Sequence, residues 1–316
     1  MDYLILLLGF AALIVGGEFL VKGSVGLALK VGMSSLAIGM TIVSFGTSVP
    51  ELLVSIQAVF QEGANHPEHM SVGNIVGSNI ANLSLVLGVT AIIAPVMVSK
   101  ISLVQDWPVL MGASLLATYF MMDLVVTWTE GIILFSVLIV FTIYMIVRSI
   151  RSKESPEDDP DIDRDNQKSM WLNILFIALG ITGLAFGSTW LVSSATNIAT
   201  SFDVSPFVIG VTVLAFGTSV PELVTSAIAA FKGETDLALG NLMGSNIFNI
   251  LSVLGLTAIL TPVPLTQTIF DTDIIWMLVI VVLVLLLMLN KRKLTRWKGV
   301  FLVLFYLVYV GMLFMR

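Results

Sequence analysis

The chain of 316 residues has no cysteine and very few charged residues. Without cysteine it has neither disulfides nor cysteine-based metal or redox centres. Only 11% of its residues are charged, against about 25% in an ordinary soluble domain, which is too few to cover a soluble fold of this size. The two histidines, His66 and His69, share one short polar segment. These shortages exclude a soluble enzyme, a disordered protein and a nucleic-acid binder.

Apolar sequence is abundant instead: 57% of the residues are hydrophobic and the mean hydropathy is +1.01. A helix needs about 20 mostly apolar residues to cross a bilayer. The first such stretch has no basic region before it and no convincing cleavage site after it, so it is interpreted as a span rather than a signal peptide. Ten spans are predicted, over residues 3–21, 36–61, 70–94, 105–122, 130–148, 170–191, 205–231, 237–261, 273–290 and 297–315. The predicted fold class is an all-α integral membrane protein.

Lysine and arginine predict the orientation, because both are enriched in cytoplasmic loops. With both termini outside, Arg316 is the only one of the 15 basic residues that falls outside. This pattern predicts a multi-pass protein of the cell membrane with its central loop, 149–169, in the cytoplasm. The loop carries an acidic run, 159–165, but lacks the glycine and final glutamate of an EF-hand. We interpret it as a solvated linker, with a calcium-regulatory site as the alternative.

The two halves of the sequence repeat each other. Gly39–Leu52 (GMTIVSFGTSVPEL) and Gly210–Leu223 (GVTVLAFGTSVPEL) are identical at ten of fourteen positions, and Val72–Pro95 matches Leu239–Pro262 at fourteen of twenty-four. We divide the chain into a first five-helix repeat, 1–148, the linker, and a second five-helix repeat, 170–316. Because five is odd, the second repeat enters the membrane from the opposite side. Inverted-topology repeats are typical of secondary transporters, whose substrate site lies at the midplane on broken helices.

Glu51 and Glu222 occupy equivalent positions of this repeat, deep within predicted spans. An acidic residue at membrane depth costs about 2.5–3.5 kcal/mol on insertion scales, so two of them indicate a function. A proline precedes each glutamate, kinks the helix and frees a carbonyl one turn earlier, at Gly46 and Gly217. Carboxylates, carbonyls and nearby hydroxyls are the ligands that Ca²⁺ and Na⁺ prefer. The alternative is a pair of protonated glutamates with a structural role alone.

A second motif, GN-x-x-GSNI-x-N, occurs at Gly73–Asn82 and again at Gly240–Asn249. Its serine and last asparagine are four residues apart and face one way on a helix. Its other asparagines are expected to hold helices together; these are Asn74, Asn79, Asn241 and Asn246. Glu18, near the end of the first span, is expected to pair with Lys22 one turn later.

Two copies of GTSVPE, each followed by GN-x-x-GSNI-x-N, resemble the alpha repeats of the sodium/calcium exchangers, in the calcium/cation antiporter superfamily. The resemblance covers both halves and is closest to the compact prokaryotic members. It implies that Glu51 and Glu222 are the central Ca²⁺ ligands. It also implies supporting roles at the ion sites for Thr47, Thr218, Ser48, Ser219, Ser78, Ser245, Asn82 and Asn249, and for the carbonyls of Ser44 and Ala215.

The function expected from this resemblance is secondary active exchange of Na⁺ for Ca²⁺ by alternating access, with Ca²⁺ exported. The two ions are transported substrates, and we expect no enzyme activity, no cofactor, no nucleic acid and no obligate protein partner beside the lipid bilayer. Asparagine at both 82 and 249, where relatives often have aspartate, argues against potassium coupling. Alternatives are a proton/calcium antiporter, which would have asparagine where Thr47 and Thr218 stand, a cation channel and an intramembrane hydrolase.

Overall fold

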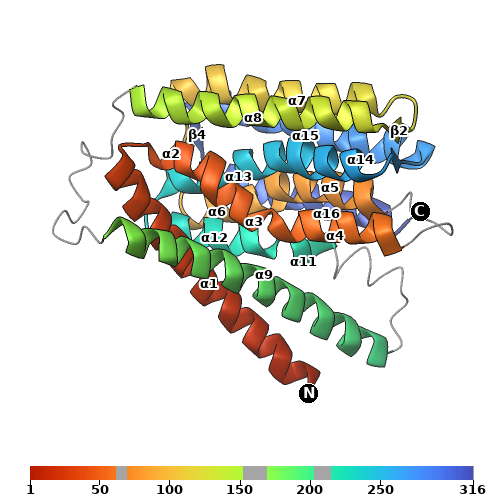
Figure 1. The fold of residues 1–316 in the computed structure, drawn as a ribbon, viewed down its shortest axis with the longest axis horizontal. Coiled ribbons are helices and arrows are strands. Elements are labelled where there is room, and N and C mark those ends of the chain that lie inside the picture. The colour runs from red at the N-terminus through yellow and green to blue at the C-terminus, as the bar shows by residue number, and fades with distance from the viewer. Residues whose placement is uncertain (62–69, 152–168, 203–214, 316) are drawn as a thin grey trace.

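The computed structural model describes residues 1–61, 70–151, 169–202 and 215–315 (Figure 1). It is an all-α membrane fold, in which eight helical stretches of the described residues are long and apolar enough to cross a bilayer. All ten predicted spans coincide with helices in the part of the chain that is described. The two histidines, the acidic run of the linker and Arg316 lie outside the described residues.

Short breaks and π-helical turns interrupt the helices of the first repeat. Its elements are α1 (Asp2–Val31), α2 (Ser35–Ile38), the π-helical η1 (Gly39–Val43), α3 (Ser44–Thr47), α4 (Val49–Gln61), α5 (Met70–Ala81), the π-helical η2 (Asn82–Val86), α6 (Leu87–Ile93), β1 (Val96–Met97), the π-helical η3 (Ser102–Asp106), α7 (Trp107–Phe120), β2 (Val125–Val126) and α8 (Trp128–Arg151).

The second repeat follows the same order. Its described elements are α9 (Met170–Ser201), α11 (Ala215–Thr218), α12 (Val220–Phe231), α13 (Thr235–Phe248), the π-helical η7 (Asn249–Leu254), α14 (Gly255–Leu260), β3 (Val263–Pro264), the π-helical η8 (Ile269–Ile274), α15 (Ile275–Leu289), β4 (Lys293–Leu294) and α16 (Arg296–Leu313). Within the described residues, η7, η8 and the break between α11 and α12 recur at places equivalent to η2, η3 and the break between α3 and α4, as expected for two copies of one unit.

The two long helices α1 and α9 lie side by side and run obliquely to the other helices (Figure 1). Glycines let their backbones approach closely. A Cβ built on Gly16 would lie 2.8 Å from the backbone nitrogen of Leu184, and one on Gly180 would lie 2.6 Å from that of Leu20. Such contacts between small residues are a common way for helices to associate in membranes.

The last helix of each repeat packs against the other repeat. α16 contacts α6, and α8 contacts α14, at the close glycine pairs Gly88–Gly299 and Gly131–Gly255. Two short antiparallel pairings also join the repeats: β1 pairs with β4, and β2 pairs with β3. The repeats are therefore interlocked, and each one completes the packing of its counterpart.

One charged contact differs from its predicted form. Glu18 on α1 forms an ion pair with Lys232 at the end of α12, and not with Lys22. Lys22 lies over the ring of Phe176 instead, 5.8 Å from its centroid. The prediction considered only neighbours on one helix, whereas α12 packs against α1 and brings a second lysine to Glu18.

Candidate cation site

Equivalent breaks in two helices position the buried glutamates. Ser48 interrupts the helix between α3 and α4 with φ −85° and ψ 4°, and Ser219 interrupts the helix between α11 and α12 with φ −87° and ψ 1°. Each new helix begins one residue later, so Glu51 and Glu222 lie in its first turn. The free N–H groups and the dipole of a helix N-terminus favour negative charge there. The breaks thus provide a favourable place for two carboxylates inside an apolar bundle.

Unpaired oxygens and amides occur on these glutamates, on the helices that carry them and on elements that contact those helices. Glu51 and Glu222 are both 0% exposed, and three of their four carboxylate oxygens have no hydrogen-bond partner among the described residues. The same holds for the whole side-chain amides of Asn82 and Asn249 and for the hydroxyl of Ser219. Since roughly 90% of buried polar groups are paired in proteins, this cluster has the chemistry of a site that coordinates a ligand.

Hydroxyl groups from the two repeats meet at this cluster. The Ser48 hydroxyl donates to Glu222 Oε1 at 3.3 Å. Thr47 Oγ1 lies 3.2 Å from Ser245 Oγ, and Ser78 Oγ lies 3.4 Å from Thr218 Oγ1. Each contact joins one repeat to the other, and all these side chains are buried. The structure therefore brings Glu222, both threonines and three of the four predicted serines into contacts between the repeats. Among the described residues, the side chains of Glu51 and Ser219 make no hydrogen bond to this set.

The remaining predicted residues lie on the broken helices that carry the glutamates or on elements that contact those helices. Asn82 and Asn249 each begin a π-helical turn, η2 and η7, a distortion that is frequent at functional sites. The carbonyl of Ser44 accepts bonds from the backbone N–H of Ser48 at 3.0 Å and from the Thr47 hydroxyl at 3.3 Å. Ala215 is the first residue of α11, and its side chain is outside the described part.

One carbonyl that was predicted to be free accepts a side-chain hydrogen bond. The hydroxyl of Ser188, on α9, donates to the carbonyl of Gly217 at 2.9 Å. Pro221 has no N–H to donate to this carbonyl, and the Ser188 hydroxyl uses one of its two lone pairs, so the other stays available to a ligand. The repeat is asymmetric here, because the position equivalent to Ser188 is Gly17, which has no hydroxyl.

Two asparagines contact the cluster in a way that sequence reasoning missed. Asn74 accepts a hydrogen bond from Thr218 at 3.2 Å, and Asn241 accepts one from Thr47 at 3.1 Å. Their position on the same motif as Ser78 and Ser245 was the available signal. The contacts themselves lie between repeats, where a sequence pattern does not indicate which side chains meet.

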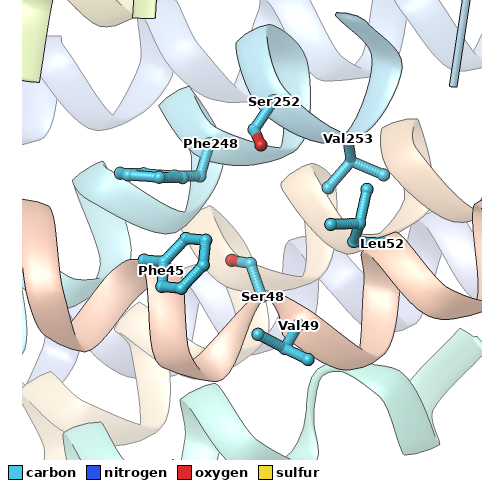
Figure 2. Close-up of a pocket in the computed structure, with 7 residues that line it drawn as sticks. All are labelled: Phe45, Ser48, Val49, Leu52, Phe248, Ser252 and Val253. Carbon is cyan, nitrogen blue, oxygen red and sulfur yellow. The ribbon is translucent and has the colours of Figure 1, made fainter. Parts of the chain in front are cut away.

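A narrow pocket with a cavity volume of about 10 Å³ lies beside the cluster, between α3–α4 and α13–η7 (Figure 2). The rings of Phe45 and Phe248 meet there edge to face, with centroids 5.9 Å apart. The hydroxyls of Ser48 and Ser252 point into the gap between the two helices (Figure 2). Ser48, which lines the pocket, also donates to Glu222, so one side chain is shared by the pocket and the cluster.

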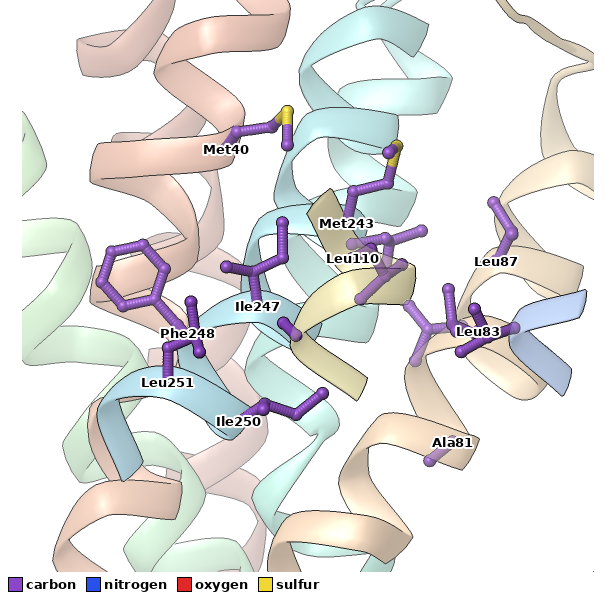
Figure 3. Packing of buried hydrophobic residues seen from close by; sticks show 14 of the residues in the cluster. Met40, Ala81, Leu83, Leu87, Leu110, Met243, Ile247, Phe248, Ile250 and Leu251 are labelled. Carbon is purple, nitrogen blue, oxygen red and sulfur yellow. The ribbon is translucent and has the colours of Figure 1, made fainter. Parts of the chain in front are cut away.

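Buried apolar side chains pack around α13 and η7, the helices that carry Ser245 and Asn249. Met243, Ile247 and Phe248 of α13 pack with Met40 of η1 and Leu110 of α7 (Figure 3). Apolar side chains of this kind exclude water from the site and so strengthen electrostatic interactions within it. The described residues contain no group of three or more His, Asp or Glu side chains that could hold a metal. A cation bound here would therefore rely on two carboxylates and on neutral oxygens.

Comparison with known proteins identifies the family. The family described as sodium/calcium exchanger protein matches residues 1–147 and 172–315. The chain is 34% identical to the membrane protein MJ0091 of Methanocaldococcus jannaschii, over 97% of this chain and 96% of that one. It is 29% identical to the sodium/calcium exchanger MaX1 of Methanosarcina acetivorans, over 99% and 98% of the two chains.

Solved structures agree with these matches. A structure of the sodium-calcium exchanger NCX_Mj, soaked with 2.5 mM Na⁺ and 0.1 mM Ca²⁺, superposes with a TM-score of 0.82 at 29% sequence identity. The match covers 98% of this chain and 97% of that one. The family resemblance inferred from the two repeated motifs is confirmed, and the chain belongs to the sodium/calcium exchanger family.

Proposed function

We propose that this protein exchanges Na⁺ for Ca²⁺ across the cell membrane and exports Ca²⁺. The observation that carries the proposal is the pair of fully buried glutamates at equivalent positions, with unpaired oxygens among neutral donors from both repeats. The names of its relatives MaX1 and NCX_Mj, both sodium/calcium exchangers, support the choice of ions.

The charges explain how exchange would work. Two ionised carboxylates are neutralised by one Ca²⁺ or by two Na⁺, and either set of ions needs the same oxygens. The two substrates therefore compete, and the site crosses from one side to the other only when one of them neutralises it. Because the site returns across the membrane only with the other ion bound, Na⁺ moving down its gradient drives Ca²⁺ in the opposite direction.

Each predicted site residue has a role in this proposal. Glu51 and Glu222 hold Ca²⁺, supported by Thr47 and Thr218. The flanking sodium positions use the hydroxyls of Ser48, Ser78, Ser219 and Ser245 with the carbonyls of Ser44 and Ala215, and the amides of Asn82 and Asn249 complete the centre. The oxygens of these groups match the preference of both ions for hard ligands.

The proposal includes an arrangement in the membrane. Both termini face outside, and the linker 149–169 joins the two five-helix repeats in the cytoplasm, as the distribution of lysine and arginine predicts. Na⁺ entering down its gradient then drives Ca²⁺ outward by rocking of one helix group against the other, as in other inverted-repeat transporters.

Substitution of the glutamates tests the proposal. Glu51→Gln and Glu222→Gln each remove one charge from the site, so Na⁺-driven uptake of radioactive calcium by inverted vesicles should fall by about tenfold or more, since ligand charge sets Ca²⁺ affinity. Glu18→Gln is the matched control: this carboxylate is half-exposed and pairs with Lys232, so uptake should remain close to that of the unmodified protein.

The choice of driving ion is tested in the same vesicles. Calcium uptake should follow an imposed Na⁺ gradient and should stop when a pH gradient is imposed without Na⁺. Uptake driven by the pH gradient alone would favour the proton/calcium antiporter. Normal Na⁺-driven uptake in both glutamine variants would contradict the assignment of the site.

A further inference from the structure

Two asparagines outside the proposed set of ion ligands hydrogen-bond to residues within it. Asn74 on α5 and Asn241 on α13 are equivalent residues of the second motif. Each contacts a site threonine of the other repeat, Thr218 in one case and Thr47 in the other. The same contact on both sides of the pseudo-symmetric site suggests a common task.

The direction of the hydrogen bond is fixed at Asn74. Its Nδ2 donates to the carbonyl of Glu51 at 3.3 Å and to the hydroxyl of Ser55 at 3.1 Å. A backbone carbonyl can only accept, so the amide nitrogen must face Glu51 and the amide oxygen must face Thr218. That oxygen lies 3.2 Å from Thr218 Oγ1 and can only accept. Thr218 therefore gives its hydroxyl proton to Asn74.

The bond from Thr218 to Asn74 also sets the direction of the contact between Thr218 and Ser78. Thr218 Oγ1 lies 3.4 Å from Ser78 Oγ, in a contact that either group could donate. A threonine hydroxyl has a single proton, and that proton is directed to Asn74, so Ser78 has to be the donor. Both hydroxyls then point their protons along the chain Ser78, Thr218, Asn74, and their remaining lone pairs stay available to a cation.

The second repeat holds the mirror arrangement. Asn241 Nδ2 donates to Ser226 Oγ at 3.0 Å, and Asn241 Oδ1 accepts from Thr47 at 3.1 Å. Thr47 Oγ1 lies 3.2 Å from Ser245 Oγ, the counterpart of Ser78. The carbonyl of Ser44, at 3.3 Å, is a second acceptor for the Thr47 proton. The Glu222 carboxylate is also within hydrogen-bond reach of the Thr47 and Ser245 hydroxyls. The Asn241 oxygen and the Ser44 carbonyl are the neutral acceptors that can keep the Thr47 proton from it.

We propose that Asn74 and Asn241 are positioning residues that set the direction of the hydrogen bonds in the cation site. They hold the hydroxyls of Thr218 and Thr47, and through them those of Ser78 and Ser245, so that these groups offer lone pairs and not protons to the ion. The inference rests on the proposed function, because it assumes that the hydroxyls coordinate a cation. Without the asparagine oxygen, the threonine proton turns toward the nearest carboxylate and competes with Ca²⁺.

Calcium binding to the purified full-length protein tests this role without requiring transport. Titration calorimetry should show that Asn74→Ala weakens Ca²⁺ binding by about tenfold, which corresponds to the loss of about one oriented hydrogen bond. In transport, the half-saturating Ca²⁺ concentration should rise by a similar factor while the maximal rate changes less. Asn246→Ala is the matched control: Asn246 is a buried asparagine of the same motif that donates to the carbonyl of Leu242, and it should leave Ca²⁺ affinity within about twofold of the parent.

A double-mutant cycle separates positioning from a general loss of packing. If Asn74 acts through Thr218, then Asn74→Ala should weaken binding no further in a protein that already carries Thr218→Val. Asn74→Ala combined with Thr47→Val, on the other arm, should give the product of the two separate effects, because the arms use different hydroxyls. A structural role alone would not distinguish the two threonines.

The outcomes distinguish this inference from the proposed function. An unmodified protein that binds no Ca²⁺ contradicts the function itself. Unmodified Ca²⁺ affinity in Asn74→Ala, or independent effects of Asn74→Ala and Thr218→Val, overturns the positioning role while leaving the exchanger intact. If Asn74→Ala cannot be purified, the equivalent cycle on Asn241 and Thr47 is judged by the same criteria.

Discussion

Among single residues, the asparagines at 82 and 249 set the charge of the proposed site. They are buried, and their amides have no partner among the described residues. Because both are neutral, the two glutamates alone supply the charge, which one Ca²⁺ balances. This balance lets Ca²⁺ be held and still be released, since a stronger negative charge would retain it.

Asn249→Asp changes this balance and gives a prediction at the residue scale. A third carboxylate leaves one negative charge after Ca²⁺ binds, so the half-saturating Ca²⁺ concentration should fall several-fold and the maximal exchange rate should fall as release slows. Radioactive calcium uptake over a range of Ca²⁺ concentrations, at a constant Na⁺ gradient, measures both quantities. Asn82→Asp should behave alike, because it is the equivalent residue. An unchanged half-saturating concentration in both variants would place these asparagines outside the ion site.

The residues that sequence reasoning located are those that the repeat duplicates. Glu51 and Glu222 stand out because a charge within a span is costly and occurs twice at one position. Hydrogen-bond partners were not predicted in the same way. Ser188, which donates to the carbonyl of Gly217, lies on a helix without a recognisable motif. Likewise, the contact of Asn74 with Thr218 depends on how two repeats pack, which no local pattern indicates.

At the scale of elements, the pairing of α1 with α9 depends on backbone contact at glycines. A Cβ on Gly180 would lie 2.6 Å from the nitrogen and 2.8 Å from the Cα of Leu20. These are backbone atoms and cannot turn away as a flexible side chain would. The two helices must therefore separate to accept even one methyl group.

Gly180→Ala should accordingly destabilise the protein, by about 1–3 kcal/mol as is usual for overpacking. Thermal unfolding of the purified protein measures the effect as a lower midpoint. Gly112→Ala is the control, because a Cβ on that glycine of α7 meets nothing within 4 Å and alanine is the better helix former. Equal midpoints for the two variants would show that α1 and α9 do not pack as closely as described.

At the scale of the whole molecule, hydropathy predicted where helices lie but not how they interlock. The ten apolar stretches coincide with helices because each has to bury its backbone groups within itself in lipid. The packing of α8 and α16 against the opposite repeat depends on contacts between glycines that lie more than 40 residues apart in the sequence, such as Gly88 and Gly299. The small pairings of β1 with β4 and β2 with β3 follow from that packing and have no sequence signal of their own.

The lack of cysteine makes the predicted topology directly testable, because any introduced cysteine is the only one in the chain. Asp123→Cys and Thr268→Cys, one in each repeat, lie in loops predicted to face outside, and Ser169→Cys and Arg296→Cys lie in segments predicted to be cytoplasmic. All four positions are exposed in the structure. A membrane-impermeant maleimide should therefore label the first pair in intact cells and the second pair only after permeabilisation.

The cysteine-free parent is the internal control, since it should take up no label in either condition. The four positions test direction and number of crossings separately. If both pairs exchange behaviour, the protein is inserted in the opposite orientation, although Na⁺ entering down its gradient would still drive Ca²⁺ outward. If the two members of a pair label differently in intact cells, an odd number of the predicted spans between them does not cross. Loss of the span 130–148 would insert both repeats in the same direction, and the two glutamates could not then meet as inverted copies.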